Sequence, residues 1–490
     1  MKVSIVTEGF QNTGYGHITR CLSLYQAFEE KNILPTFFIN GDDHAKNYLG
    51  DSNYKLINWL THPTKLISEV NGSDILIIDS YHAGKEYYET LSKLSKISLF
   101  LDDYMRLDYP AGIILNGTIN AETFPYKKNP ASQYLLGVKY IPIRKEFWNT
   151  SSRKINQSVG SILITYGGQD IRGLTIPTYK SVQNNFPHVK KILVVGNGNV
   201  HQKEFEKLRN ESTEIFYSID AAKMFELMLA SDIAISAAGQ TLYELAVTGT
   251  PTIAVAVADN QRGNILEWKK NNFLIDPIFQ GDSNHQKKIV EQLSAMQSVS
   301  LRKKLSAKGK SNVDGQGSRR IIKFLIDKIC SEENFYLRKA TEKDSDIVFQ
   351  LSNDPTVREQ SINRNPIEYK DHLKWYPSKI GNEKYIFLLA FDKEDNFIGQ
   401  VRFELNNQEA IASISISKQF RGKGLSKKIL MNACPKVLSE KPDIKNVIAY
   451  IRPENIASIK SFTSAKFIFY QKEMINEECF EKYILSKEQQ

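Results

Sequence analysis

Short apolar runs alternate with helix-like segments through the first two thirds of the chain, and this alternation limits the folds that it can adopt. Runs that are apolar throughout are typical of parallel strands whose sheet is covered by helices on both faces. A polar stretch at 149–159 interrupts the alternation and indicates a linker. The sequence therefore predicts two α/β domains of Rossmann type, at 1–150 and 158–330, that face each other across a cleft. The runs lie at 3–6, 75–78, 97–101, 162–164, 192–195, 233–235 and 253–255.

The last third of the chain has a different character. Apolar runs at 385–391 and 397–403 are joined by a polar turn at 392–396, which is a hairpin signal. The run at 411–416 alternates between apolar and small or polar residues, as a strand with one buried face does. An α+β domain is therefore expected at 335–488. The predicted class is α/β, with a pair of Rossmann-type domains followed by this α+β domain.

Composition and charge narrow the class of ligand. The 490-residue chain carries a net charge of +9, which suits anionic ligands. Its basic residues form no arginine-rich arm, so nucleotide-sized anions are favoured over nucleic acid. Its four cysteines contain no Cys-x-x-Cys pair, so neither a disulfide framework nor a metal site is expected. With no signal-like start and no apolar run of about 18 residues, a cytoplasmic protein without a membrane partner is predicted. The oligomeric state stays open.

A histidine follows the first apolar run at the end of a glycine turn. Gly14 and Gly16 precede His17, and apolar residues recur at helical spacing from Ile18. His17 is therefore expected at a helix N-terminus, on the sheet edge where open α/β folds bind ligands. A histidine there titrates near neutral pH and can transfer a proton. A helix-capping or packed histidine is the structural alternative.

Further small-residue turns follow strands of the second predicted domain. Residues 167–170 form one turn, and 236–244 open a helix where backbone N–H groups can approach a pyrophosphate. Glu244, about one turn into that helix, is placed to accept hydrogen bonds from ribose hydroxyls. Asn260 and Gln261 follow the next strand and bring amides to the same edge. Together these turns predict a site for a nucleotide diphosphate.

Taken together, these segments resemble the UDP-sugar hydrolase of the pseudaminic acid pathway, a GT-B-fold relative of the lipid II-forming glycosyltransferases. The resemblance covers about residues 1–320, and it implies a UDP-sugar substrate and a GT-B-like pair of Rossmann-type domains. The matching blocks are Gly14–Cys21, Asp79–Tyr81, Asp102–Asp103, Leu136–Gly137 with Arg144 and Phe147, Gly167–Asp170, Gly239–Thr241 with Glu244, and Asp259–Gln261.

The resemblance also implies roles for individual residues. His17 would be the general base that activates water against the anomeric carbon, expelling UDP with inversion and without a metal. This family commonly carries Arg-x-Asp at the end of its first strand, whereas this chain has Thr7-Glu8-Gly9, with Glu8 as the available substitute for the acid. The substrate-binding residues so implied are Gly14, Gly16, Arg20, Tyr81, Arg144, Gly168, Gly239, Gln240, Thr241, Glu244, Asn260 and Gln261.

A second anion-binding signature lies in the last domain. The segment Gln419-x-x-Gly422-x-Gly424 follows the run at 411–416 and opens a helix expected to end near Ala433, before Pro435. Its glycines would expose successive N–H groups to a pyrophosphate.

This segment and a downstream motif, Asn455-x-x-Ser458-x-x-x-Phe462, resemble the GNAT N-acetyltransferases over about 335–485. Within that family, the segments Asn353-Asp354-Pro355-x-Val357-Arg358 and His372-x-x-Trp375 resemble the sugar-amine branch. The resemblance implies acetyl-CoA as co-substrate. The cofactor-binding residues so implied are Ile416, Gln419, Arg421, Gly422, Lys423, Gly424, Leu425, Ser426, Asn455, Ser458 and Phe462.

Two positions depart from the GNAT pattern. Many members have a tyrosine acid where this chain has Phe462, and a glycine where it has Lys466. The base that deprotonates the amine is then Glu404, His372 or a chain of waters. An exposed strand residue and a helix-packing residue are the respective structural alternatives for Glu404 and His372.

The two units fit one pathway. The GNAT step would acetylate the 4-amine of a UDP-4-amino-4,6-dideoxy sugar, and the hydrolase would release UDP from the resulting UDP-2,4-diacetamido-2,4,6-trideoxyhexose. Two alternatives remain. One is a GT-B glycosyltransferase with a GNAT domain, and the other is a nucleotide-sugar-binding protein whose acetyltransferase domain is inactive.

Overall fold

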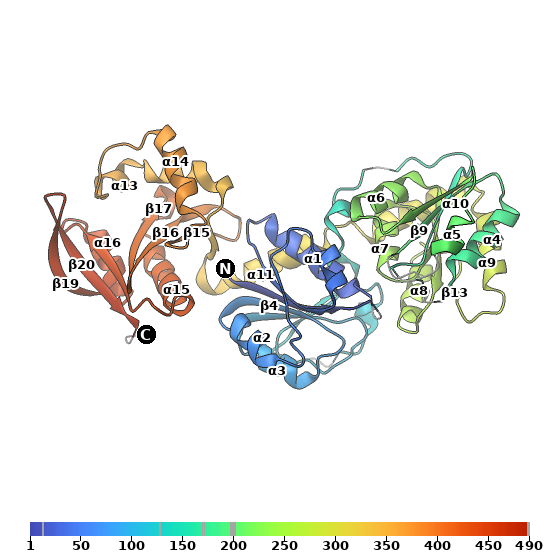
Figure 1. Ribbon diagram of the computed structural model, residues 1–490, viewed down its shortest axis with the longest axis horizontal. Coiled ribbons are helices and arrows are strands. Elements are labelled where there is room, and N and C mark those ends of the chain that lie inside the picture. Colours follow the sequence, from blue (N-terminus) through green and yellow to red (C-terminus); the bar gives the residue numbers. More distant parts are fainter. Residues whose placement is uncertain are drawn as a thin grey trace. The chain divides into compact units, whose positions relative to one another are not determined.

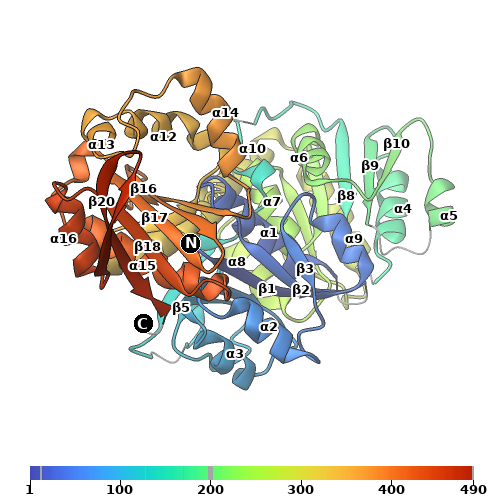
Figure 2. The same cartoon turned by 60° about the vertical axis from the view of Figure 1, so that its left-hand side comes forward.

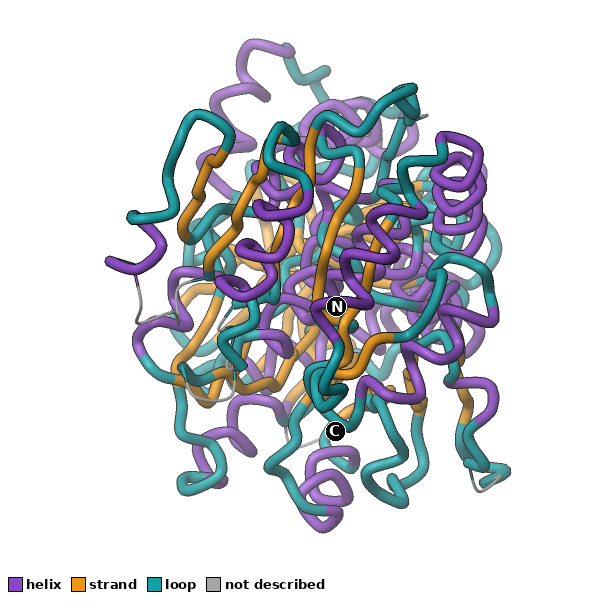
Figure 3. Tube along the Cα trace, turned by 90° about the vertical axis from the view of Figure 1, so that its right-hand side faces the viewer, coloured by secondary structure: helices purple, strands orange, loops and turns teal. Residues whose placement is uncertain are grey.

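The computed structural model describes residues 1–11, 14–126, 129–151, 153–168, 170, 172–196 and 202–487. They form two compact units, one over Lys2–Phe324 and one that contains Leu325–Gln490 (Figure 1). Figure 3 distinguishes the strands along the trace from the helices that cover them.

The N-terminal part of the first unit is built on a parallel sheet. In the described residues seven strands pair in the order β3-β2-β1-β4-β5-β6-β7, and every neighbouring pair is parallel. The order reverses between β1 and β4, which is the switch point where open α/β sheets bind ligands. The strands are β1 (Val3–Gly9), β2 (Thr36–Gly41), β3 (Tyr54–Leu56), β4 (Ser73–Asp79), β5 (Ser95–Leu101), β6 (Ile113–Asn116) and β7 (Gln133–Leu136).

Helices cover both faces of this sheet, as its apolar strands require. On one face, α2 and α3 pack against buried side chains of β1, β4 and β5, and α1 lies on the other face (Figure 1). The Ser318 hydroxyl in the first turn of α11 bonds to that of Ser23 in α1. The helices are α1 (Gly16–Glu29), α2 (Pro63–Val70), α3 (Lys85–Ser92) and α11 (Gly317–Glu333), with 3-10 turns η1 (Asp43–Tyr48), η2 (Ala121–Thr123), η3 (Val138–Tyr140) and η4 (Lys145–Phe147).

The rest of the first unit repeats this plan. Its described strands form a parallel sheet in the order β10-β9-β8-β11-β12-β13, with the switch point between β8 and β11. Successive residues of β8 join two different apolar clusters, so both sheet faces are buried. The elements are β8 (Ser161–Thr165), α4 (Thr175–Asn185), β9 (Lys190–Val195), α5 (Gln202–Glu206), β10 (Thr213–Tyr217), α6 (Ala221–Ala230), β11 (Ile233–Ala237), α7 (Gln240–Thr248), β12 (Thr252–Ala256), α8 (Gln261–Lys270), β13 (Ile278–Phe279), α9 (His285–Ala295) and α10 (Val299–Asn312).

The second unit holds one mixed sheet in the order β14-β15-β16-β17-β18-β20-β19. Its neighbouring strands are antiparallel except β17 and β18, which pair in parallel only over Glu409–Ile411 and Asn446–Ile448. Helix α15 packs on one face, and α12 and α14 lie on the other (Figure 2). The elements are β14 (Tyr336–Lys339), η5 (Glu342–Asp344), α12 (Ser345–Ser352), α13 (Pro355–Glu359), α14 (Tyr369–Lys379), β15 (Tyr385–Phe391), β16 (Phe397–Asn406), β17 (Glu409–Ile416), η6 (Lys418–Phe420), α15 (Leu425–Glu440), β18 (Asn446–Ile451), α16 (Ile456–Ser464), β19 (Ile468–Ile475) and β20 (Glu478–Ser486).

The predicted fold class is confirmed: two Rossmann-like domains precede an α+β domain. The expected end of one helix is wrong. Helix α15 continues through Pro435 to Glu440, although a proline inside a helix removes one backbone hydrogen bond. Cys434, Val437 and Leu438 are buried in the core of the unit, so packing outweighs the cost of the proline.

Candidate active sites

His17 lies at the switch point of the first sheet and has a carboxylate partner. It is in the first turn of α1, directly after β1, and its Nδ1 is 2.7 Å from Oδ1 of Asp79, the last residue of β4. An aspartate on Nδ1 favours the tautomer that leaves Nε2 with a free lone pair, and Nη2 of Arg20 also lies 3.1 Å from Nδ1. The side chain is 15% exposed, and no described residue bonds to Nε2. The geometry leaves a basic nitrogen open to a small molecule.

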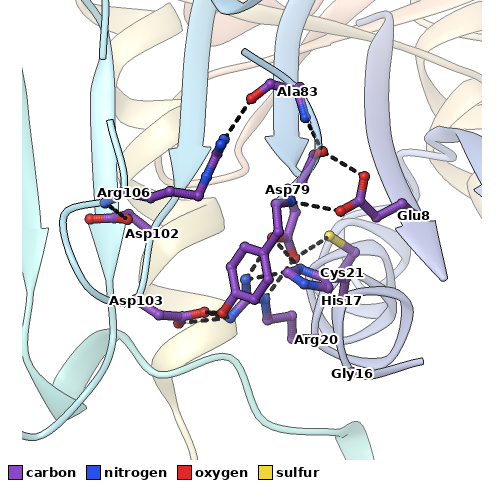
Figure 4. Close-up of polar contacts among 12 residues, drawn as sticks. Glu8, Gly16, His17, Arg20, Cys21, Asp79, Ala83, Asp102, Asp103 and Arg106 are labelled. Atoms are coloured by element: carbon purple, nitrogen blue, oxygen red, sulfur yellow. Dashed lines mark hydrogen bonds and ion pairs between the residues drawn. The ribbon is translucent and has the colours of Figure 1, made fainter. Parts of the chain in front are cut away.

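Arg20, one helical turn after His17, anchors the same aspartate. Its Nε and Nη2 each donate to one oxygen of Asp79 at 2.6 Å, and its Nη1 donates to both oxygens of Asp103 (Figure 4). The Tyr81 hydroxyl donates to Asp103, and its ring stands edge-on to that of His17 with 4.3 Å between centroids. All three guanidinium nitrogens of Arg20 thus donate hydrogen bonds within the protein, and they hold the His17–Asp79 pair in position.

Charge pairing sets the ionisation of this cluster. Burial alone would raise the pKa of Asp79, but the Arg20 guanidinium and the His17 ring beside it hold that pKa well below its usual value. Burial alone would lower the pKa of Arg20, which Asp103 and Asp79 raise instead. Asp79 therefore stays a carboxylate at neutral pH and can balance positive charge on the imidazole ring.

Glu8, which stands in the segment that departs from the family pattern, has a structural contact. It is buried in β1, and its carboxylate accepts hydrogen bonds from the Ser80 hydroxyl at 2.6 Å and the Tyr81 N–H at 2.7 Å. These bonds fix the turn after β4 that carries Tyr81.

Two helix N-termini of the second sheet lie where the sequence places a diphosphate. Gly239 precedes α7 and Asn260 precedes α8, and neither helix has a side-chain cap or an acidic residue in its first turn. The N–H groups of Gln240 and Thr241 at the start of α7 are therefore available to an anion. Those of Gln261 and Arg262 in α8 donate to the carbonyls of Ala258 and Asp259 instead. The side chains of Gln240 and Gln261 are tied to the backbone: the Gln240 Nε2 donates to the Pro142 carbonyl, and the Gln261 Oε1 accepts from Val257.

The remaining expected residues of the first unit are placed as follows. Thr241 lies in the first turn of α7 and is partly exposed, and Gly168 lies in the turn after β8. Gln169 of the same block lies outside the described residues. Gly14 forms a bridge with Phe10, and Gly16 begins α1. In the described part of the chain, no group of three or more His, Cys, Asp or Glu could hold a metal ion, and no helix is long and apolar enough to cross a membrane.

Arg144 and Glu244, both expected to contact substrate, bind each other. Arg144 Nε and Nη2 donate to the two carboxylate oxygens of Glu244 at 2.6 and 2.8 Å, and Glu244 is buried. This bidentate pair joins the segment before η4 to α7. It occupies one side of the Glu244 carboxylate, whose oxygens keep further lone pairs that can accept hydrogen bonds.

Removing Arg144 alone is expected to destabilise the first unit. The Arg144→Ala variant leaves the Glu244 carboxylate buried without its partner, which costs about 3 kcal/mol of unfolding free energy. Replacing Arg144 and Glu244 together by Met removes both charges and costs less. Urea unfolding followed by tryptophan fluorescence measures the difference, and equal losses in the two variants would contradict the pairing.

The loop after β17 in the second unit has the backbone expected of an anion cradle. Gly422 and Gly424 have φ of 77° and 71°, and an added Cβ at either would meet no atom within 4 Å. Glycine is therefore required at these two positions because of the positive φ, and not because a larger side chain would lack space. Gly424 precedes α15, whose first turn has no side-chain cap and no acidic residue. Leu425 is buried and Ser426 is partly exposed in that first turn.

Two other side chains that were expected to bind the cofactor, those of Arg421 and Lys423, already make contacts within the protein. Arg421 Nη2 donates to Asp354 at 2.8 Å and its Nε to the Ile416 carbonyl, whereas the Lys423 ammonium lies over the Phe420 ring. Gln419 lies in η6.

The downstream motif begins α16. The Asn455 side chain caps the helix by accepting from the Ser458 N–H at 3.0 Å. Phe462 is buried edge-on to Phe467. Lys466 has a φ of 70°, in the left-handed region, which explains why a glycine suits this position in the resembled family.

The two expected bases differ in access. His372 is 1% exposed, is packed among Phe349, Tyr369 and Tyr376, and has Nε2 at 2.9 Å from the Ser345 carbonyl. Burial lowers its pKa. This is the helix-packing arrangement, so a substrate cannot reach the ring. Glu404 is exposed on β16, where it accepts a hydrogen bond from the Tyr385 hydroxyl at 2.9 Å.

Asp79 and Asp103 have a role that the sequence alone did not indicate. Both appeared only within matching blocks, yet their carboxylates hold Arg20, and Asp79 also orients His17. A signal was present, because Asp79 ends one parallel strand and Asp103 follows the next. Carboxylates at neighbouring strand ends share an edge with whatever follows β1.

Comparison with known protein families places both units. Residues 162–323 match the model of the glycosyltransferase family 28 C-terminal domain, and residues 334–468 match the acetyltransferase (GNAT) domain. Among solved structures, the chain is similar to spermidine N-acetyltransferase from Vibrio cholerae in complex with CoA and spermine, at 17% identity over 32% of this chain and 97% of that one, with a TM-score of 0.30.

Three curated relatives align with different shares of the chain. Uncharacterized protein MJ1062 of Methanocaldococcus jannaschii is 24% identical over 98% of this chain and 99% of its own length. Spore coat polysaccharide biosynthesis protein SpsG of Bacillus subtilis is 22% identical over 67% of this chain and 98% of its own length. Pseudaminic acid cytidylyltransferase and UDP-2,4-diacetamido-2,4,6-trideoxy-beta-L-altropyranose hydrolase of Helicobacter pylori is 28% identical over 53% of this chain and 45% of its own length. Two domain models thus match one after the other along the chain, the glycosyltransferase family 28 C-terminal domain and then the acetyltransferase (GNAT) domain.

Proposed function

We propose that the chain is a bifunctional enzyme of nucleotide-sugar metabolism. Its first unit hydrolyses UDP-2,4-diacetamido-2,4,6-trideoxy-β-L-altropyranose to UDP and the free sugar, with inversion. Its second acetylates the 4-amino group of the UDP-amino-sugar precursor with acetyl-CoA. The observation that carries the hydrolase is the 2.7 Å contact between His17 and Asp79 at the switch point. The name of the 28% identical relative supports the substrate.

The proposed hydrolysis needs a base, a water and a stabilised leaving group. His17 Nε2 takes a proton from water, whose oxygen forms a bond to the anomeric carbon while the bond to the diphosphate breaks. Asp79 balances the positive charge on the ring. The free N–H groups at the start of α7 stabilise the departing UDP, with Glu244 accepting from the ribose.

Incubation of the protein with that UDP-sugar and no acceptor tests the hydrolase. Phosphorus NMR should show UDP, and proton NMR should show a free sugar of inverted anomeric configuration. Absence of UDP would contradict the proposal for this sugar. The family 28 match favours a second candidate, transfer of the sugar to an acceptor, which predicts that UDP appears only when an acceptor is added.

In the proposed acetyl transfer the loop 419–424 and the start of α15 bind the pyrophosphate of acetyl-CoA. Glu404 takes the ammonium proton, the amine nitrogen forms a bond to the thioester carbonyl carbon, and the C–S bond breaks to release CoA as a thiolate. The second proton of the attacking nitrogen passes through water to the thiolate, because Phe462 has no proton to give. Thiol release with a UDP-4-amino-4,6-dideoxy sugar tests this step. A protein that binds acetyl-CoA but releases no thiol would support the inactive-domain alternative.

Substitution of one glycine in the proposed acetyl-CoA loop gives a more specific test of cofactor binding. Gly424→Val forces a β-branched residue into a φ of 71° and redirects the N–H groups around it, so KM for acetyl-CoA should rise at least about tenfold. Gly381→Val is the matched control, since Gly381 has a φ of 76° and equally open surroundings. It should leave that KM unchanged, and equal effects of the two substitutions would contradict the assignment.

A further inference from the structure

One face of the sheet in the second unit carries polar residues beneath α12 and α14. Side chains alternate along a strand, so Gln400, Arg402 and Glu404 of β16 share a face, whereas Val401 and Phe403 point into the core with α15. Arg402 is opposite Phe387 of β15 and Ser413 of β17 in the sheet register.

The Arg402 guanidinium is held in place without an ion pair to any described carboxylate, although the charge of Glu404 acts to raise its pKa. It lies over the rings of Trp375 and Phe387, 5.3 and 5.7 Å from their centroids, and its Nε donates to the Ser413 hydroxyl. The nearby Glu404 carboxylate is bonded to the Tyr385 hydroxyl instead.

A second arginine, Arg358, lies close enough for its charge to act on Arg402. Arg358 of α13 has a buried Nε without a hydrogen-bond partner, and no ion pair joins it to a described carboxylate. Burial and the charge of Arg358 lower the pKa of Arg402 to about 10, and burial lowers the pKa of Arg358 as well. Gln400, 2% exposed on the same face, has an Oε1 without a partner. Two close cations with unused donors cost free energy unless an anion binds them.

We infer that Arg358 and Arg402 bind phosphate oxygens of the acceptor, so that the amine acetylated by the second unit belongs to a nucleoside diphosphate sugar. This inference rests on the proposed acetyltransferase function and adds the two residues that select the acceptor. The loop 419–424, which follows β17, is proposed to hold the cofactor's own pyrophosphate, whereas Arg402 lies in mid-strand on the face away from α15. A polycationic acceptor would be repelled by the arginine pair.

Kinetics with two acceptors test the assignment. Arg402→Gln should raise KM for a UDP-4-amino-4,6-dideoxy sugar about 10- to 100-fold, as expected for lost hydrogen bonds to a charged group. KM for acetyl-CoA and kcat should stay within about twofold, and Arg402→Lys should restore part of the loss. Arg364→Gln, an exposed arginine of the same unit that pairs with Glu454 and Glu478, is the control and should change neither KM. A wild-type protein that acetylates the nucleotide-free amino sugar with the same KM would overturn the inference.

A binding experiment decides the inference without turnover. Equilibrium dialysis of UDP against the full chain, with CoA saturating its own site, counts the bound nucleotide. The Arg358→Gln, Arg402→Gln double variant should bind one fewer UDP per chain than the wild type, and UDP bound by the first unit should remain. Equal numbers would overturn the arginine assignment even if acetyl transfer occurs. A loss of one UDP in a protein without acetyl transfer would support the site and contradict the proposed reaction.

Discussion

Replacement of His17 by Gln should lower kcat for UDP release by about 10²- to 10⁴-fold. The glutamine can still bond to Asp79, but it has no basic nitrogen in place of Nε2, so the attacking water loses its base. Positioning and stabilisation of the leaving diphosphate remain, which leaves residual hydrolysis above the uncatalysed rate. KM should change little, because His17 acts on water. The measurement is UDP release under saturating UDP-sugar.

Two controls separate this effect from damage to the fold. Acetyl transfer by the second unit of the His17→Gln protein should equal that of the wild type in the same preparation. His44→Gln replaces an exposed histidine in η1 and should leave UDP release unchanged. Full UDP release by His17→Gln would exclude His17 as the base and would favour a water activated by another group.

The position of His17 could be predicted from the sequence, because a strand, a glycine turn and a helix start are local features. Its partner could not. Asp79 is 62 residues away, and only the strand order, with β4 beside β1, brings its carboxylate to the imidazole ring. The same holds for Arg20, which looked like a substrate ligand in the sequence because its two aspartates were not visible there as neighbours.

Local and long-range features differ in the same way in the second unit. The turn at Gly422 and Gly424 could be predicted because glycine is the residue type that readily adopts a positive φ. The helix stop before Pro435 was wrong because buried side chains beyond it keep α15 helical. Arg402 carried no signal, since its lack of an ion pair to a described carboxylate depends on residues from three strands and two helices.

Asp79→Asn should lower kcat for UDP release about as strongly as loss of the base itself, by up to about 10⁴-fold. The asparagine amide can donate to Nδ1 and so stabilise the tautomer in which Nε2 carries the proton, leaving no lone pair for water. The ring also loses the carboxylate that balances its charge. Because Asp79 positions His17 and does not touch the sugar, KM for the UDP-sugar should stay within about twofold.

Acid unfolding provides a readout that separates this positioning role from general damage. The pKa of Asp79 is held below its usual value near 4, so ionised Asp79 stabilises the folded state above that pH and the stabilisation is lost as the pH falls below it. The Asp79→Asn protein lacks this group, so its Tm should fall less between pH 5 and pH 3 than that of the wild type. Loss of kcat at pH 7, in a variant that keeps a cooperative thermal transition and normal acetyl transfer, would support the role of Asp79 in setting the tautomer of His17. Wild-type kcat in a folded Asp79→Asn protein would contradict it, because the imidazole would then need no carboxylate to present Nε2.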